Sequence, residues 1–292
     1  MCRLFAMTAG EERITVSHWL LDASDSLVAQ SHFEPDGTGL GFFDESGNPV
    51  VDRQPLAAFR DDEFTKVART ERSSTFLAHI RFASVPSFAI TDTHPFQREG
   101  MLFAHNGVLD GVEDLEREIG EEYMGPVEGR TDSERLFALI TKRIDELGDV
   151  GEGIASAVGW VADNVPVYSL NLTLGTADEL WALRYPDTHE LFVVERRQEG
   201  GPAPGEFYGR SHNGALRVHS QEIDDKPVVI VASERMDDHP DWRALEPGEL
   251  LHVTPDVVAH SRIILDRPPS HPLGVDDLDP RSAESQRNPK AV

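Results

Sequence analysis

A chain of 292 residues with 39% hydrophobic side chains can bury a substantial core, and its single cysteine excludes a disulfide within the chain. Acidic residues outnumber Lys and Arg by 52 to 27, a formal net charge of −25. Such a field repels phosphate backbones and anionic lipid, so we expect neither a nucleic acid nor a membrane partner. Residues 1–10 run directly into Glu11-Glu12-Arg13, which leaves no room for a secretory signal, and the expected location is the cytoplasm.

Short apolar and alternating runs predict strands along most of the chain. Two lie in the first half, at residues 74–83 and 101–105. Five lie in the second half, at residues 167–174, 179–185, 190–195, 228–232 and 249–253. Residues 175–178, Gly-Thr-Ala-Asp, predict a hairpin turn between the first two of these five.

Helices are expected at three places. Thr131-Asp-Ser-Glu134 is a capping-box pattern, in which the Thr131 hydroxyl accepts from the third helical amide and Glu134 reaches back to Thr131. Apolar residues then recur at helical spacing as far as Gly148. Residues 112–119 and 153–162 predict two more helices.

From residue 266 the chain becomes rich in Pro, Asp and Ser. Such a composition buries too little apolar surface to offset the entropy of ordering, so we expect a disordered tail over 266–292. The rest, residues 2–265, is expected to form one α+β domain that is rich in strands in its second half.

The only cysteine, Cys2, directly follows the initiator methionine. On position alone, such a cysteine is usually incidental. Removal of Met1 would, however, place a thiol and a free α-amine on one residue. The amine, with a pKa of about 7.7–8.0, can act as general base for the thiol, so Cys2 is a candidate nucleophile.

Three other segments carry groups that suit an amide substrate. Arg81, at a predicted strand end, can hold a carboxylate through two parallel hydrogen bonds. As an isolated dipeptide, Asn106-Gly107 predicts a turn, but its side-chain amide and backbone N–H could also converge on an oxyanion. Asp132 could favour the helix dipole or bind a substrate ammonium group.

Taken in order, these segments resemble the class II glutamine amidotransferase family. The motifs are Cys2, PDGTGLGFF at 35–43, AHIRFAS at 78–84, THPF at 93–96, AHNGVL at 104–109 and TDSE at 131–134. The resemblance implies a four-layer αββα N-terminal-nucleophile hydrolase sandwich with two antiparallel sheets. In this family the terminal Cys attacks the γ-amide of glutamine, forms a γ-glutamyl thioester and releases ammonia.

The resemblance also implies roles for individual residues and no metal or organic cofactor. The implied nucleophile is Cys2, and the implied oxyanion hole is Asn106 with Gly107. The implied substrate-binding residues are Arg81 for the α-carboxylate, Asp132 for the α-amino group and His94 as a pocket residue.

Departures from the family pattern leave the substrate open between glutamine and another γ-glutamyl compound. Relatives that aminate sugar phosphates follow the Arg with Trp-Ala-Thr-His-Gly, whereas here Phe-Ala-Ser-Val-Pro follows at 82–86. Relatives that use the ammonia carry a synthase domain or pair with a synthase subunit, which is a candidate partner. Asp36-Gly37 is closer to small stand-alone members, such as the amidohydrolase of ergothioneine synthesis.

Two rival interpretations remain. His79, His94 and His105 could converge on zinc, although no His-Glu-x-x-His or paired-Cys spacing accompanies them. The chain could also be a non-catalytic or regulatory binder of a γ-glutamyl metabolite or a partner synthase. A terminal thiol argues against that second interpretation, because binding alone would not need it.

Overall fold

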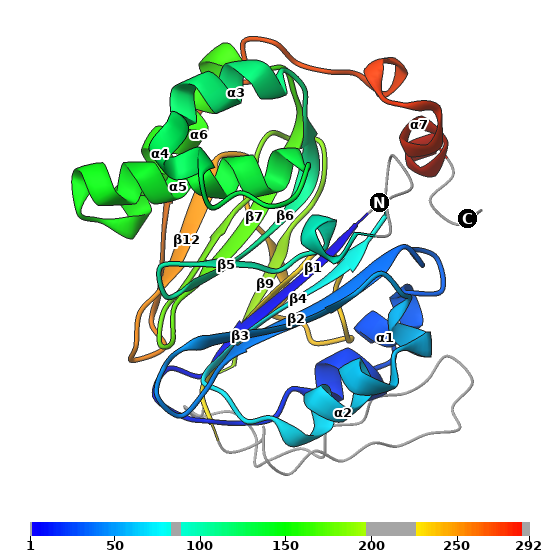
Figure 1. Ribbon diagram of the computed structural model, residues 1–292. Coiled ribbons are helices and arrows are strands. Elements are labelled where there is room, and N and C mark those ends of the chain that lie inside the picture. Colours follow the sequence, from blue (N-terminus) through cyan, green and yellow to red (C-terminus); the bar gives the residue numbers. More distant parts are fainter. Residues whose placement is uncertain (1, 83–88, 197–225, 288–292) are drawn as a thin grey trace.

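In the computed structural model, which describes residues 2–82, 89–196 and 226–287, two antiparallel sheets face one another (Figure 1). The first has the strand order β11-β9-β10-β1-β4-β2-β3 and the second β13-β12-β8-β7-β6-β5. The strands of the first sheet are β1 (Arg3–Thr8), β2 (Gly37–Phe43), β3 (Pro49–Gln54), β4 (Thr75–Arg81), β9 (Phe192–Arg196), β10 (Val228–Ala232) and β11 (Arg243–Ala244). Those of the second are β5 (Phe96–Arg98), β6 (Met101–Leu109), β7 (Val167–Gly175), β8 (Leu180–Leu183), β12 (Glu249–Val253) and β13 (Ala259–Ile263).

Helices cover the outer face of each sheet (Figure 1). The first sheet is covered by α1 (Leu27–Gln30), α2 (Asp62–Thr70) and short helical turns at His18–Asp22 and Ala58–Arg60. The second is covered by α3 (Val112–Ile119), α4 (Glu121–Met124), α5 (Asp132–Leu147) and α6 (Val150–Asn164). Short turns at Ile90–Asp92 and Val275–Asp277 and a last helix, α7 (Pro280–Arg287), complete the described elements.

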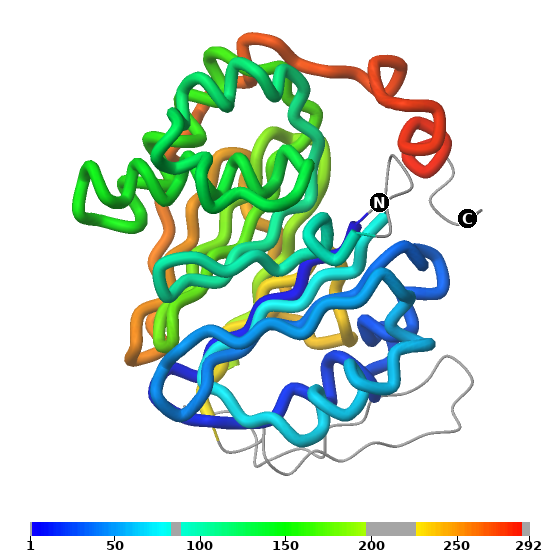
Figure 2. The backbone as a smooth tube through the Cα atoms, viewed as in Figure 1, coloured from blue at the N-terminus to red at the C-terminus, as the bar shows by residue number. Residues whose placement is uncertain are grey.

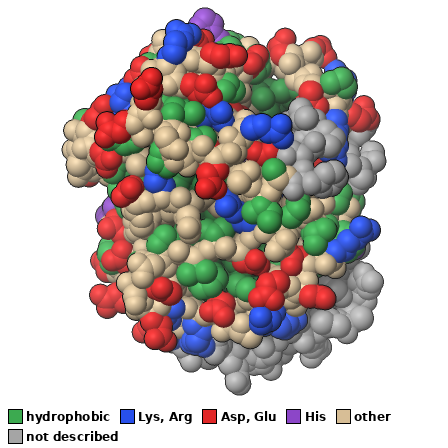
Figure 3. Space-filling model, viewed as in Figure 1, with side chains coloured by type: hydrophobic (Ala, Val, Ile, Leu, Met, Phe, Trp, Pro, Cys, Tyr) green, Lys and Arg blue, Asp and Glu red, His purple; other side chains and the backbone are tan. Residues whose placement is uncertain are grey.

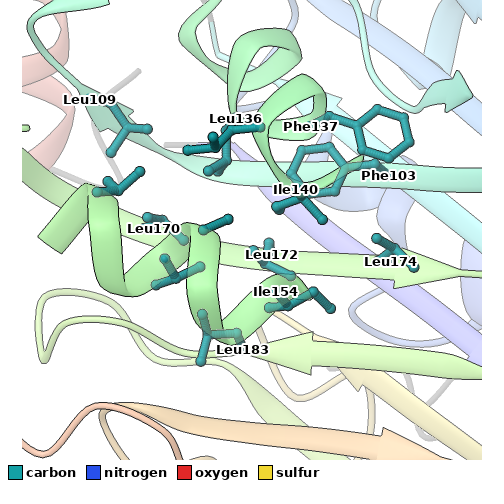
Figure 4. Packing of buried hydrophobic residues seen from close by; sticks show 14 of the residues in the cluster. Phe103, Leu109, Leu136, Phe137, Ile140, Ile154, Leu170, Leu172, Leu174 and Leu183 are labelled. Carbon is teal, nitrogen blue, oxygen red and sulfur yellow. The ribbon is translucent and has the colours of Figure 1, made fainter. Parts of the chain in front are cut away.

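Three apolar cores separate the four layers. Alternation along β1 places Leu4 and Ala6 in the core between the sheets, and Phe5 and Met7 in the core under the first helical layer. The third core lies between the second sheet and helices α5 and α6 (Figure 4). There the Phe103 and Phe137 rings are stacked with centroids 4.8 Å apart. These layers confirm the predicted αββα sandwich.

The predicted strands and helices are found close to their expected positions. The turn after β7 is the predicted hairpin, with the Thr176 amide donating to the Glu179 carbonyl at 3.0 Å. Asn106-Gly107 does not form a turn, because β6 continues through both residues to Leu109 and pairs with β7 throughout. The sequence analysis did not predict β1, β2 or β3, or helix α2.

The capping box at Thr131 is only half formed. Thr131 Oγ1 accepts from the Glu134 amide at 3.2 Å, as predicted. The Glu134 carboxylate instead accepts from the Glu128 and Gly129 amides at 3.0 and 2.6 Å. These two loop amides need an acceptor because they lie in a partly or fully buried setting.

The structure also differs from the tail expected after residue 265. The Ser270 amide donates to the Ala162 carbonyl at 2.7 Å, and the His271 carbonyl accepts from Val167 at 2.9 Å. The chain then crosses to the end of the molecule where β1 begins, and α7 lies beside that end (Figure 2). The prediction of disorder was based on the small number of apolar side chains in this segment. Backbone hydrogen bonds to α6 and β7 hold its first part in place. Residues 288–292 of the expected tail lie outside the described part.

The surface agrees with the strongly acidic composition. On the face in Figure 3, Asp and Glu are spread over the visible surface with Lys and Arg among them. Of the helices that the structure describes, none has the length and apolarity to cross a bilayer.

Candidate active site

Cys2 lies at the start of β1, a central strand whose neighbours are β10 and β4. The backbone amide of Phe82, just beyond β4, donates to the Cys2 Sγ at 3.2 Å. Burial raises the pKa of the Cys2 thiol, and this Phe82 hydrogen bond opposes the rise. The thiol therefore has one fixed donor that stabilises its thiolate.

Asn106 and Gly107 reach the same cavity from β6, in the opposite sheet. Asn106 is 3% exposed, and its side-chain Nδ2 has no hydrogen-bond partner among the described residues. A buried amide donor left without a partner is costly, so this group is available to a bound oxygen. At Gly107, a Cβ would lie 1.9 Å from the Ser169 carbonyl oxygen, which explains the need for glycine.

The cavity around Cys2 is small, about 60 Å³. Its lining comes from the start of β1, the end of β4, strands β6 and β7, the loop before β9 and the C-terminal segment. The residues are Cys2, Phe82, Asn106, Gly107, Val108, Tyr168, His189, Leu278, Ser282, Ser285 and Gln286.

The other three predicted site residues do not line this cavity. Arg81 is 8% exposed, one residue before Phe82 at the end of β4. The His94 ring packs 4.2 Å from the His79 ring, centroid to centroid. Asp132 begins α5, and its Oδ2 accepts from the Leu109 amide at 2.8 Å. The segment after Phe82, including Ala83 and Ser84, lies outside the described residues.

The three histidines of the zinc interpretation are buried under the site. Burial lowers the pKa of His79 to about 3, and it also lowers the pKa values of His94 and His105. His105 Nδ1 is 2.9 Å from Ser133 Oγ. Within residues 2–82, 89–196 and 226–287, no three His, Cys, Asp or Glu side chains are arranged to hold a metal ion.

Several residues around Cys2 were not predicted from the sequence. Arg3 Nη1 donates to the Cys2 carbonyl at 3.4 Å, and Arg3 Nη2 pairs with the buried Glu34 carboxylate at 3.3 Å. Burial raises the pKa of Glu34, and the Arg3 charge opposes that rise. His189 also lines the cavity, and burial lowers its pKa to about 4. These residues come from distant segments without a shared motif, so only the Arg directly after Cys2 offered a signal.

The Gly-rich motif at 35–43 forms β2, next to β4. At Gly39, opposite His79, a Cβ would lie 1.9 Å from the His94 carbonyl oxygen. At Gly37, opposite Arg81, a Cβ would lie 3.3 Å from the Arg81 Cβ. The glycines therefore let the His94-Pro95 segment and the Arg81 side chain pack closely on this strand.

Two facing antiparallel sheets between helical layers, with a cysteine at the start of a central strand, define the fold of the N-terminal-nucleophile hydrolases. Within this class, residues 1–265 match the family described as glutamine amidotransferases class-II, and the chain belongs to that family. The match confirms the resemblance seen in the sequence.

Known proteins similar to this chain include two curated relatives and a solved structure. A probable glutamine amidotransferase of Saccharomyces cerevisiae is 28% identical over 51% of this chain, which spans about half (47%) of that relative. A gamma-glutamyl-hercynylcysteine sulfoxide hydrolase of Mycobacterium tuberculosis is 30% identical over 80% of this chain and 98% of its own length. The glutamine aminotransferase class-II domain protein of Silicibacter pomeroyi has a TM-score of 0.59 at 23% identity, covering 90% of this chain and 100% of that one.

Proposed function

We propose that this protein hydrolyses the γ-amide bond of glutamine or of a γ-glutamyl compound through a thioester on Cys2. The observation that carries the proposal is the cavity shared by Cys2, the unpartnered Asn106 amide and Gly107. It places a thiol next to a buried donor with no protein acceptor. Membership of the family supports the same chemistry.

In the first half of the reaction, the free α-amine of Cys2 takes the thiol proton. The thiolate attacks the γ-carbonyl carbon, and the Asn106 and Gly107 N–H groups stabilise the resulting oxyanion, each worth about 3 kcal/mol. The amine then returns the proton to the leaving nitrogen as the C–N bond breaks. Water attacks the thioester in the second half, releasing the γ-carboxylate and restoring the thiol.

The glutamyl end of the substrate is assigned to residues outside the present cavity lining. Arg81 is proposed to bind the α-carboxylate and Asp132 the α-ammonium group, with His94 supporting the pocket. Asp132 Oδ1 accepts from the Ser133 amide and hydroxyl, whereas Oδ2 accepts from the Leu109 amide and keeps a lone pair for an ammonium donor. The name of the mycobacterial relative supports a γ-glutamyl compound larger than glutamine as the alternative substrate.

The test is hydrolysis of glutamine and γ-glutamyl amides by untagged protein. Cys2→Ala should abolish turnover, and Asn106→Ala should lower kcat by about 10²–10³-fold, the loss typical of one oxyanion donor. Asn164→Ala is the matched control, since Asn164 is exposed on α6 and its side chain donates to the Trp160 carbonyl of the same helix at 2.8 Å. Wild-type turnover by the Cys2→Ala protein would overturn the proposal.

The role of the α-amine needs its own measurement. An uncleaved N-terminal tag converts the amine to an amide that cannot accept a proton, so the tagged protein should lack turnover. Intact-mass spectrometry should show loss of Met1 in the active protein. Full activity with the tag in place would show that another group acts as the base.

A further inference from the structure

The C-terminal segment lines the cavity that contains Cys2. Its residues Leu278, Ser282, Ser285 and Gln286 border the same space as Asn106 and Gly107. In Figure 1, α7 lies beside the N-terminal end of β1 although the two are at opposite ends of the chain. This part of the lining lies beyond residue 265, where the family match ends.

One contact holds α7 against the strand ends near Cys2. Arg281 Nη2 pairs with the Asp36 carboxylate at 2.7 and 3.0 Å. The same guanidinium lies 4.7 Å above the centre of the Phe82 ring. Phe82 supplies the amide bound to Cys2 Sγ, so the contact lies directly beside the nucleophile.

A second contact joins α7 to the candidate oxyanion strand. Gln286 Oε1 lies 3.0 Å from His189 Nε2, and His189 Nδ1 lies 3.0 Å from Ser169 Oγ. Ser169 Oγ in turn donates to the Asn106 carbonyl at 3.1 Å. A line of side chains within hydrogen-bond distance of one another therefore runs from α7 to the backbone of Asn106.

With α7 in this position, the cavity beside Cys2 is too small for the proposed substrates. About 60 Å³ accommodates about four water molecules, at about 15 Å³ of such volume for each. Glutamine has more than twice that number of non-hydrogen atoms, and a γ-glutamyl compound has more. A substrate of that size at Cys2 therefore requires part of the lining to move, and α7 is a part that belongs to neither sheet.

We propose that α7 is a displaceable cap on the Cys2 pocket, which Arg281 and Gln286 hold closed and a γ-glutamyl substrate must displace. The inference rests on the proposed function for the identity of the substrate. The cap itself rests on the lining, the two contacts and the volume. It makes the C-terminal segment a determinant of which compounds reach the thiol.

The test compares the rate of Cys2 alkylation by two reagents, followed by intact mass. One reagent is a diazo-ketone glutamine analogue, and the other is iodoacetamide. Arg281→Ala should accelerate both reactions about threefold to tenfold. This is the effect expected when a partly exposed ion pair and a cation–π contact that hold α7 are both lost. Gln286→Ala should act in the same direction. Arg287→Ala is the matched control, because it removes an arginine of the same helix that pairs with Asp276.

The outcomes separate the cap from the proposed function. Unchanged alkylation rates in both Arg281→Ala and Gln286→Ala would overturn the cap. The proposed function would still stand in that case if the analogue labels Cys2. Faster reaction with iodoacetamide, combined with no labelling by the analogue in any variant, would support the cap and overturn the glutamyl pocket. Equal acceleration by Arg287→Ala would also overturn the cap, since that side chain does not line the cavity.

Discussion

Asp132 is hydrogen-bonded to Leu109: its Oδ2 accepts from the Leu109 backbone amide at 2.8 Å. Its Oδ1 accepts from the Ser133 amide at the same distance. The carboxylate therefore ties the first turn of α5 to the end of β6, the strand that carries Asn106 and Gly107. Any role of Asp132 in substrate binding has to be separated from this structural one.

Asp132→Asn removes the charge and keeps only one of the two acceptor oxygens, so KM is measured together with the free energy of unfolding, which reports the structural loss. We expect KM for glutamine to rise about 10–100-fold, the value of a hydrogen bond to a charged group, with a smaller change in kcat. Asp145→Asn, on the exposed side of the same helix, is the control and should leave KM unchanged. A wild-type KM for Asp132→Asn in steady-state kinetics would remove Asp132 from the substrate site.

Gly107→Ala tests how tightly β6 packs against β7. The added Cβ would lie 1.9 Å from the Ser169 carbonyl oxygen and 2.4 Å from His105 Nε2, so the strands would have to separate. We expect a loss of about 1–3 kcal/mol in the free energy of unfolding. Gly159→Ala is the control in α6, where a Cβ meets no atom within 4 Å, and should be neutral or stabilising. Urea denaturation of both variants measures the difference.

Much of the fold was predictable from local patterns. In strands such as β7 and helices such as α5, apolar side chains recur with the spacing that is typical of a buried strand or of a helix with a buried face. Strand β1 was missed because Cys2 and its neighbours were considered only for their chemistry. Strand β2 was missed because its three glycines lower strand propensity. The reason for them, close packing on Arg81, His94 and Leu102, exists only in the folded protein.

The site was only partly predictable for the same reason. Ordered motifs made Cys2, Asn106 and Gly107 candidates, and the fold brings these three residues into one cavity. His189 and Gln286 could not be identified, because their contact joins residues 97 positions apart that share no motif. The composition of the C-terminal segment predicted disorder, since composition does not register a helix held by an ion pair and by polar side chains.

Glu134 should matter more for stability than the helix cap itself. Thr131→Ala removes one cap hydrogen bond, which costs about 1 kcal/mol. Glu134→Ala leaves the Glu128 and Gly129 amides without their acceptor, at about 1–3 kcal/mol for each group that stays buried. The Tm of Glu134→Ala in thermal unfolding should therefore be lower than that of Thr131→Ala. The reverse order would mean that water replaces the carboxylate at both amides.

The buried histidines make the folded protein sensitive to acid. Burial lowers the pKa of His79 to about 3, whereas an imidazole in the unfolded chain titrates at about 6.5. Between these values the unfolded chain binds more protons, so stability is fully present above about pH 6.5 and is lost as the pH falls. His94 and His105 are shifted in the same direction and should add to the loss.

His79→Gln isolates one of these contributions, because glutamine is polar but does not titrate. Between about pH 7.5 and about pH 5.2, the wild type should lose more of its free energy of unfolding than the variant does. The difference between the two losses should be about 2 kcal/mol. The lower limit stays above the isoelectric point of about 4.7, where the protein would lose its net charge and precipitate. Urea denaturation at each pH gives the slope of the free energy of unfolding against pH for the wild type and for the variant. A destabilisation by the substitution that is the same at every pH does not change this slope. Equal slopes would show that His79 is accessible to protons in the folded protein.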